Sequence, residues 1–228
     1  MRHALQVLPD AEAVARAAAL HLAERARAAV AHHGRCAIAV SGGRTPWRML
    51  EALVALPAGQ VPWPDLVVHQ VDERVAPAGD PDRNSGRLLE VLRATPARVL
   101  PMPVEAPDLD AAAAAYAAAL PERFDLVHLG LGADGHTASL VPGDGVLDVT
   151  DRLVALTAEP YQGRRRMTLT YPALARADQL LWLVTGSAKA AALRGLLAGA
   201  TDIPAGRVSA ADSLVMADAE AAAQQSEG

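Results

Sequence analysis

The sequence predicts an α/β domain with a mainly parallel sheet and helices on both faces. Two observations favour this class. Short runs rich in Val, Leu and Ile alternate with Ala-rich helical stretches, and these runs are apolar at consecutive positions. Strands that are apolar on both sides are typical of parallel sheets covered by helices on each face. Strands are expected at 5–8, 36–40, 66–71, 124–129, 153–156, 167–170, 180–184 and 213–216.

Capping residues predict where the helices begin and end. Asp10 can cap a helix over 11–33, which Gly34 ends. Thr45 as N-cap, with Pro46 at the first helical position, opens the next helix. Further helices are expected over 88–94, over 108–120 with Asp108 as cap, and over 187–197 with Ser187 as cap.

Length and composition restrict the class of protein. The 228 residues suit a single domain over 1–218, followed by a polar tail over 219–228 that is expected to fray. The lone Cys36 excludes a disulfide framework and favours a reducing, cytoplasmic setting. A net charge of −5 argues against general nucleic-acid binding. Every apolar run is too short for a membrane span, so we expect no membrane partner.

The first candidate motif joins the strand at 36–40 to the following helix and reads Ser41-Gly42-Gly43-Arg44-Thr45. Adjacent glycines let the backbone approach a ligand closely. The free N–H groups at a helix start suit a phosphate. The motif therefore indicates a phosphate-binding loop, although an ordinary strand-to-helix turn would look the same.

The second motif, GLGADGH over 130–136, follows the strand at 124–129. It fits the GxGxxG dinucleotide fingerprint, but Asp134 would place a carboxylate where the pyrophosphate should lie. His136 instead suggests a catalytic base that Asp134 orients. A short helix starting after His136 would disfavour its imidazolium form. The competing interpretation is a capping aspartate beside a surface histidine.

Charged residues form the remaining candidates. Asp72, Glu73 and Arg74 directly follow a buried strand, where charges are costly unless paired or used. Asn84 and Lys189 are the only Asn and Lys in a chain with 51 Ala and 20 Arg, which raises the expectation that each is needed. The alternative is a solvated charged loop and a surface lysine.

The run Arg164-Arg165-Arg166 is a concentrated cationic patch on an acidic chain. The planar guanidinium fork suits a phosphate. We expect at least one of the three to be only a solvated arginine. Cys36 and Trp182 lie within apolar strands and are expected in the core.

Five blocks, in order, carry a resemblance: SGGRTP, VDERVAP with DRNSG, LGLGADGHTASLVPG, RRMTLTYPAL and GSAKAAAL. Together they resemble the glucosamine-6-phosphate isomerase/6-phosphogluconolactonase family over residues 41–193. The resemblance implies a Rossmann-like fold shared with glucosamine-6-phosphate deaminases and ribose-5-phosphate isomerases. It also implies hydrolysis of 6-phospho-D-glucono-1,5-lactone to 6-phosphogluconate, the second step of the oxidative pentose phosphate pathway.

The resemblance also assigns roles. It implies that His136 is the general base, that Asp134 and Asp72 shape its surroundings, and that Arg74 lies near the substrate. A lactone is an activated ester, so this chemistry requires no cofactor, metal or covalent nucleophile. The expected partner is a small sugar-phosphate lactone, and a monomer is compatible with the sequence. The remaining substrate-binding and phosphate-binding residues are expected to be Ser41, Gly42, Gly43, Arg44, Thr45, Asn84, Arg166 and Lys189.

The chain departs from the family in two places. Arg83 and Ser85 flank Asn84 where Ser and Tyr are common, and VPG replaces FPG after the His136 block. Two other functions stay open. An amino-sugar phosphate deaminase would need the carboxylate of its FNEP segment, which TASLVPG lacks. A non-catalytic sugar-phosphate sensor would keep the phosphate residues but would not need His136.

Overall fold

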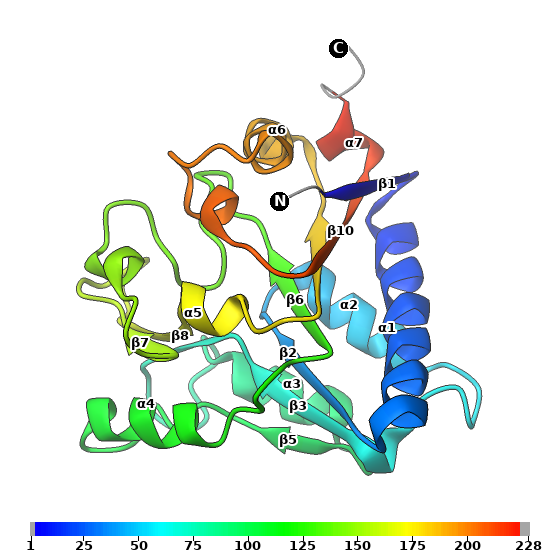
Figure 1. The fold of residues 1–228 in the computed structure, drawn as a ribbon, viewed down its shortest axis with the longest axis horizontal. Helices are drawn as coiled ribbons and strands as arrows, with labels where there is room; N and C mark the ends of the chain where they lie inside the picture. Colours follow the sequence, from blue (N-terminus) through cyan, green and yellow to red (C-terminus); the bar gives the residue numbers. More distant parts are fainter. Residues whose placement is uncertain (1–2, 224–228) are drawn as a thin grey trace.

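A seven-stranded sheet forms the centre of the computed structural model, which describes residues 3–223 (Figure 1). Every neighbouring pair of strands in it is parallel. All seven carboxyl ends therefore face the same edge. In spatial order the strands are β1 (Ala4–Leu8), β10 (Asp212–Asp218), β9 (Gln179–Val184), β6 (Leu126–Gly130), β2 (Cys36–Val40), β3 (Leu66–Gln70) and β5 (Arg98–Leu100).

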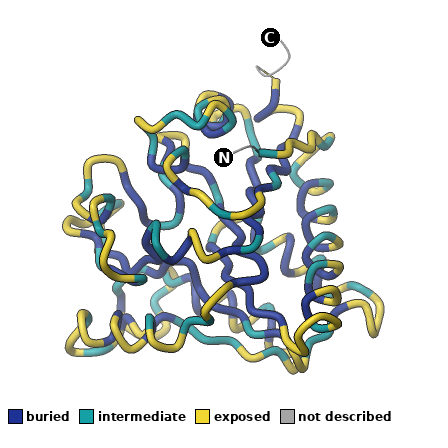
Figure 2. Tube along the Cα trace, in the orientation of Figure 1, coloured by how far each residue is buried: buried dark blue, intermediate teal, exposed yellow. Residues whose placement is uncertain are grey.

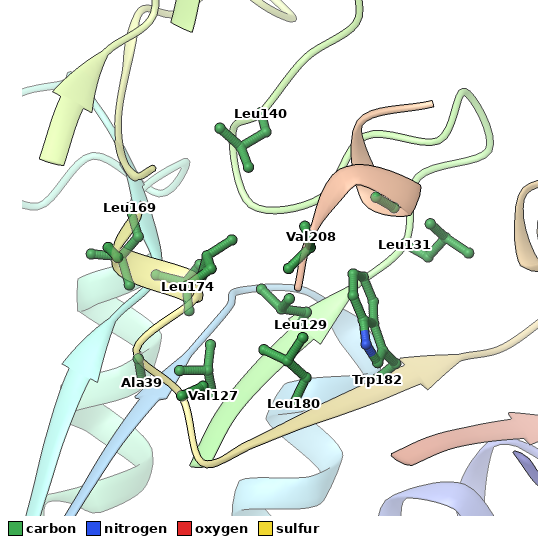
Figure 3. Close-up of a cluster of buried hydrophobic side chains, with 14 of the residues drawn as sticks. Ala39, Val127, Leu129, Leu131, Leu140, Leu169, Leu174, Leu180, Trp182 and Val208 are labelled. Carbon is green, nitrogen blue, oxygen red and sulfur yellow. The ribbon is translucent and has the colours of Figure 1, made fainter. Parts of the chain in front are cut away.

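Helices cover both faces of this sheet, as the sequence predicts. Successive side chains of a strand point to opposite faces, so Leu181 packs on one side with α1 (Ala11–His33), α2 (Arg44–Val54) and α3 (Asn84–Leu92). On the other side, Leu180 and Trp182 pack with Leu129 and Leu174 (Figure 3). Central strands are buried along their length, whereas β1 is largely exposed (Figure 2). The helices on this second side are α4 (Leu109–Ala118), α5 (Tyr171–Leu174) and α6 (Ala190–Ala198).

A second, smaller sheet continues from the carboxyl end of β3. It pairs β4 (Asp72–Arg74), β8 (Arg166–Leu169) and β7 (Val154–Leu156) in antiparallel fashion. The register places Arg74 opposite Arg166. The sequence predicts strands near β7 and β8, and it predicts a polar loop over 72–86. The loop is wrong over Asp72–Arg74, which form β4, and from Asn84, where α3 begins, and it is confirmed over 75–83. Because β4 begins two residues after β3 ends, its charged side chains lie at the carboxyl edge of the large sheet.

Several helix ends differ from expectation. Gly43, not Thr45, precedes α2, and Gly186 precedes a 3-10 turn over Ser187–Lys189 that has no side-chain cap. The expected frayed tail is wrong for Ala219–Ala222, which form α7 because Asp218 caps the helix. Residues 224–228 of that tail lie outside the described residues. Among residues 3–223, no helix is both long enough and apolar enough to span a membrane.

Candidate active site

A cavity of about 530 Å³ opens at the carboxyl edge of the parallel sheet. It lies where ligands bind in open α/β sheets. The loops after β2, β6 and β9 contribute to its walls, together with β4, β8 and α3. Of the twelve residues predicted for the site, Asp134 is the one that does not line it. The other eleven are Ser41, Gly42, Gly43, Arg44, Thr45, Asp72, Arg74, Asn84, His136, Arg166 and Lys189.

Asp134 does not line the cavity but contacts the ring of His136, which does. The Nδ1 atom of His136 is 2.5 Å from Oδ1 of Asp134. A carboxylate accepts, so Nδ1 carries the proton and Nε2 is left as the basic nitrogen. Burial opposes the ionisation of Asp134, but hydrogen bonds from His136 and Tyr161 outweigh it and lower the pKa of Asp134. A Cβ at position 132 would lie 2.0 Å from Nδ1 of His136, so Gly132 is required for this packing.

The expected helix after His136 is absent, and that prediction is wrong. Residues 131–140 form turns, and Ala138 has a φ of +52°. The hydroxyl of Thr137 donates to the carbonyl of Gly130 at 2.9 Å, and the N–H of Gly132 donates to the carbonyl of His136 at 2.8 Å. These bonds close the loop on itself. The orientation of the imidazole therefore depends on Asp134 and not on a helix dipole.

Tyr161, which the sequence analysis missed, also contacts the His136–Asp134 pair. It lies in the hairpin between β7 and β8. Its hydroxyl is 3.0 Å from Oδ2 of Asp134 and 3.2 Å from Nδ1 of His136. Tyr161 and His136 are 25 residues apart in the chain, and the hairpin brings them together. The only signal for Tyr161 in the sequence is therefore its position just before the three arginines.

Asp72 and Arg166, which also line the cavity, form a buried ion pair. Oδ2 of Asp72 accepts from the hydroxyl of Ser139 at 2.6 Å and lies 3.9 Å from Nη1 of Arg166. Burial lowers the pKa of Arg166, and Asp72 opposes that shift. The other two arginines of the run point elsewhere. Arg164 pairs with Asp80 at 2.9 Å, and Nε of Arg165 donates to a carbonyl at 3.2 Å.

The charged segment after β3 is built around Glu73, which is fully buried. Its carboxylate accepts from the backbone N–H groups of Arg74, Asn84 and Ser85, at 2.7–2.8 Å. The side-chain oxygen of Asn84 accepts from Nη1 of Arg74 at 2.7 Å, and its Nδ2 donates to the carbonyl of Asp72 at 3.1 Å. Asp72, Glu73 and Asn84 are buried in this network, so the alternative of a solvated charged loop does not hold for them, whereas Asp82 is exposed.

The start of α2 provides groups that suit an anion. No side chain caps this helix, and Gly43 precedes it with a φ of +128°. Uncapped N–H groups at a helix start attract negative charge. The Thr45 hydroxyl lies 2.9 Å from that of Thr185. Burial lowers the pKa of Lys189, Asp134 opposes the shift, and Arg44 adds to it, so these three charges act on one another.

Five basic and four acidic side chains of residues 3–223 line the cavity, although the chain as a whole carries a net charge of −5. The basic ones are Arg44, Arg48, Arg74, Arg166 and Lys189. Of the acidic ones, Asp72 lies beside Arg166, and Asp10 and Asp218 cap helices, which leaves Glu220. This concentration of positive charge favours an anionic ligand. Within the described residues, no three His, Cys, Asp or Glu side chains are grouped as ligands for a metal ion.

Comparison with known proteins shows the family of this chain. The family described as "Glucosamine-6-phosphate isomerases/6-phosphogluconolactonase" matches residues 9–216. The chain belongs to this family. Members similar to it include the 6-phosphogluconolactonase of Mesorhizobium japonicum, 36% identical over 201 residues, which covers 83% of each chain. The 6-phosphogluconolactonase of Mycobacterium tuberculosis is 34% identical and covers 98% of this chain and 99% of its own.

Solved structures support the fold assigned to this family member. The 6-phosphogluconolactonase of Trypanosoma cruzi superposes with a TM-score of 0.84 at 25% identity, covering 99% of this chain and 97% of the other. A monomeric glucosamine-6-phosphate deaminase superposes with a TM-score of 0.85 at 20% identity, covering 96% and 99%. At that identity the second likeness shows the fold alone. The expected α/β fold, shared with glucosamine-6-phosphate deaminases, is confirmed.

Proposed function

We propose that this protein hydrolyses 6-phospho-D-glucono-1,5-lactone to 6-phosphogluconate, with His136 as the general base. The observation that carries the proposal is the geometry of one ring. Nδ1 of His136 is held by Asp134, which leaves Nε2 as the basic nitrogen of a residue that lines a cavity with five basic side chains. Relatives named 6-phosphogluconolactonase, at 34–39% identity, support the choice of substrate.

The proposed reaction needs one base, which then acts as an acid. Nε2 of His136 takes a proton from water as the water oxygen bonds to the lactone carbonyl carbon. The carbonyl oxygen becomes an oxyanion in the tetrahedral intermediate. The intermediate collapses as the bond to the ring oxygen breaks, and the imidazolium returns its proton to that oxygen. Asp134 stabilises the imidazolium between the two steps, as a carboxylate does when it holds the other ring nitrogen.

Positive groups would stabilise the phosphate of the substrate and the oxyanion of the tetrahedral intermediate. The uncapped start of α2, with Lys189 nearby, is the proposed phosphate site, which would fix the lactone relative to His136. Arg74 is the proposed donor to the oxyanion. Its guanidinium is held by Asn84 and by the carbonyl of Asp82, both at 2.7 Å, so it needs no reorganisation during the reaction.

An amino-sugar deaminase is the alternative within the same fold. Leu140 and Val141 follow the His136 block as buried apolar residues, where a deaminase would place the carboxylate of its FNEP segment. Ring opening and proton shuttling would lack that group. This segment of the chain therefore favours the lactonase.

Turnover of the lactone tests the proposal. The lactone is generated enzymatically and acid release is followed with and without protein, since the compound also hydrolyses spontaneously. We expect release above the blank and no ammonia from glucosamine 6-phosphate. A rate equal to the blank would contradict the lactonase. Ammonia release would favour the deaminase, and binding without turnover would favour a sensor.

A further inference from the structure

Tyr161 lies in the hairpin between β7 and β8. Among the described residues of that hairpin, its side chain is the one that contacts both the His136–Asp134 pair and Arg166. Its hydroxyl reaches Asp134 and His136 at 3.0 and 3.2 Å, and its ring lies 5.2 Å from the guanidinium carbon of Arg166. We infer that Tyr161 is a positioning residue. It holds the His136–Asp134 pair and Arg166, which is expected to bind the substrate, in a fixed relation to each other. The catalytic consequence of this inference rests on the proposed function.

Asp134 is not enclosed by the fold, and His136 bonds only one of its two oxygens, Oδ1, through the ring Nδ1 and the backbone N–H. Its side chain is 41% exposed, and that of His136 is 25% exposed. A carboxylate that exposed can rotate towards water and release the imidazole. The Tyr161 hydroxyl binds Oδ2 while His136 binds Oδ1, so both carboxylate oxygens are fixed.

The Tyr161 hydroxyl reinforces the tautomer of His136 that Asp134 sets, because it donates to Asp134 and not to the ring. If the hydroxyl donated to Nδ1, the proton of the neutral ring would lie on Nε2 and no base would face the cavity. Donation to Asp134 avoids this and leaves Nδ1–H free to donate to the same carboxylate. Burial, with Asp134 adding to it, raises the pKa of the Tyr161 phenol, so the hydroxyl keeps its proton and acts as a donor.

Tyr161 also contacts Arg166, through its backbone carbonyl and its ring. Nη2 of Arg166 donates to the carbonyl of Tyr161 and to Oε1 of Gln162, both at 3.3 Å. The ring adds a cation–π contact. The hairpin itself is ordered by a bond from the N–H of Tyr161 to the carbonyl of Arg164 at 2.9 Å, and Arg164 is bound in turn by Asp80.

Removing only the hydroxyl tests the inference. We expect Tyr161→Phe to lower kcat by about 10-fold and to leave KM within about 2-fold, because the ring over Arg166 stays. Tyr161→Leu also removes the ring and should raise KM as well. A Tyr161→Phe enzyme with the kcat of the wild type, or one with raised KM and unchanged kcat, would overturn the inference.

Tyr171→Phe is the matched control. Tyr171 also lies beside an arginine, Arg207, at 4.9 Å, and also donates its hydroxyl, but to the carbonyl of Pro204. Neither tyrosine lines the cavity, but the hydroxyl of Tyr171 bonds Pro204 where that of Tyr161 bonds Asp134 and His136. We expect this variant to keep both kcat and KM, which shows that losing a tyrosine hydroxyl does not by itself lower turnover.

The tautomer of His136 gives a readout that does not depend on activity. In ¹⁵N-detected spectra of the neutral imidazole, the wild type should carry its proton on Nδ1, and Tyr161→Phe should shift population towards Nε2–H. An unchanged tautomer in Tyr161→Phe would overturn the inference. If the wild type failed to hydrolyse the lactone, the proposed function would fail, and this spectrum would still decide the role of Tyr161.

Discussion

Gly42 lies against the side chain of Asn84 so closely that a Cβ at position 42 would be 1.9 Å from the Asn84 oxygen. That oxygen accepts the hydrogen bond that holds Arg74. Gly42 therefore connects the proposed phosphate loop to the proposed oxyanion donor. Its φ is not positive, so the need for glycine comes from this contact and not from backbone conformation.

Gly42→Ala should displace Asn84 and release Arg74. We expect kcat/KM to fall by at least about 10-fold, the effect of losing a hydrogen bond to a charged group. Steady-state kinetics on the lactone measure it. Gly86→Ala is the control, because Gly86 lies in α3 with no atom within 4 Å of an added Cβ. That variant should keep its activity, and full activity in Gly42→Ala would refute the contact.

Arg166 should act on substrate binding. We expect Arg166→Gln to raise KM for the phosphorylated lactone by about 10-fold or more, because a neutral amide replaces a charged donor. Arg165→Gln is the matched control, since its Nε bonds only a carbonyl outside the cavity. An Arg166→Gln enzyme that keeps its KM and its preference for the phosphorylated substrate would remove Arg166 from this role.

Two buried histidines should make the fold less stable in mild acid. Burial lowers the pKa of His128 to about 3 and that of His69 to about 4. The unfolded chain takes up these protons near pH 6.5 and the folded chain does not, so stability is lost as the pH falls below 6.5. Between pH 7 and pH 5 each histidine should remove about 2 kcal/mol from the free energy of unfolding.

Urea unfolding at the two pH values measures this loss. His69→Leu should reduce the difference between pH 7 and pH 5 by about 2 kcal/mol, because this group no longer titrates. His69 lies between Tyr116 and Phe124, so an apolar side chain suits its surroundings. An unchanged pH dependence in this variant would show that another group is responsible.

The sequence predicts the elements whose signals are local. The bounds of α1 and β2 agree with expectation because Asp10 accepts the N–H of Ala13, Gly34 adopts a left-handed φ of +79°, and five consecutive apolar residues form the strand. The His136–Asp134 contact is also local, since the two residues are two positions apart. Cys36 and Trp182 are buried, as predicted.

What the sequence misses depends on pairing between distant segments. β4 reads as a loop because its residues are charged, and only its pairing with β8, from Asp72 opposite Thr168 to Arg74 opposite Arg166, makes it a strand. The role of Tyr161 depends on the hairpin between β7 and β8, which brings Tyr161 to His136 and Asp134. The helix expected after His136 fails because Thr137 bonds back to Gly130 and closes the loop. None of these contacts leaves a periodic or capping signal in the chain.

The most direct test of the account is the turnover of His136→Ala. We expect kcat for lactone hydrolysis to fall by at least about 100-fold, the lower range of general-base catalysis, while circular dichroism and the unfolding midpoint stay close to the wild type. A variant that folds and keeps a near-normal kcat would contradict His136 as the base. The base would then have to be sought at Asp72 or Asp134.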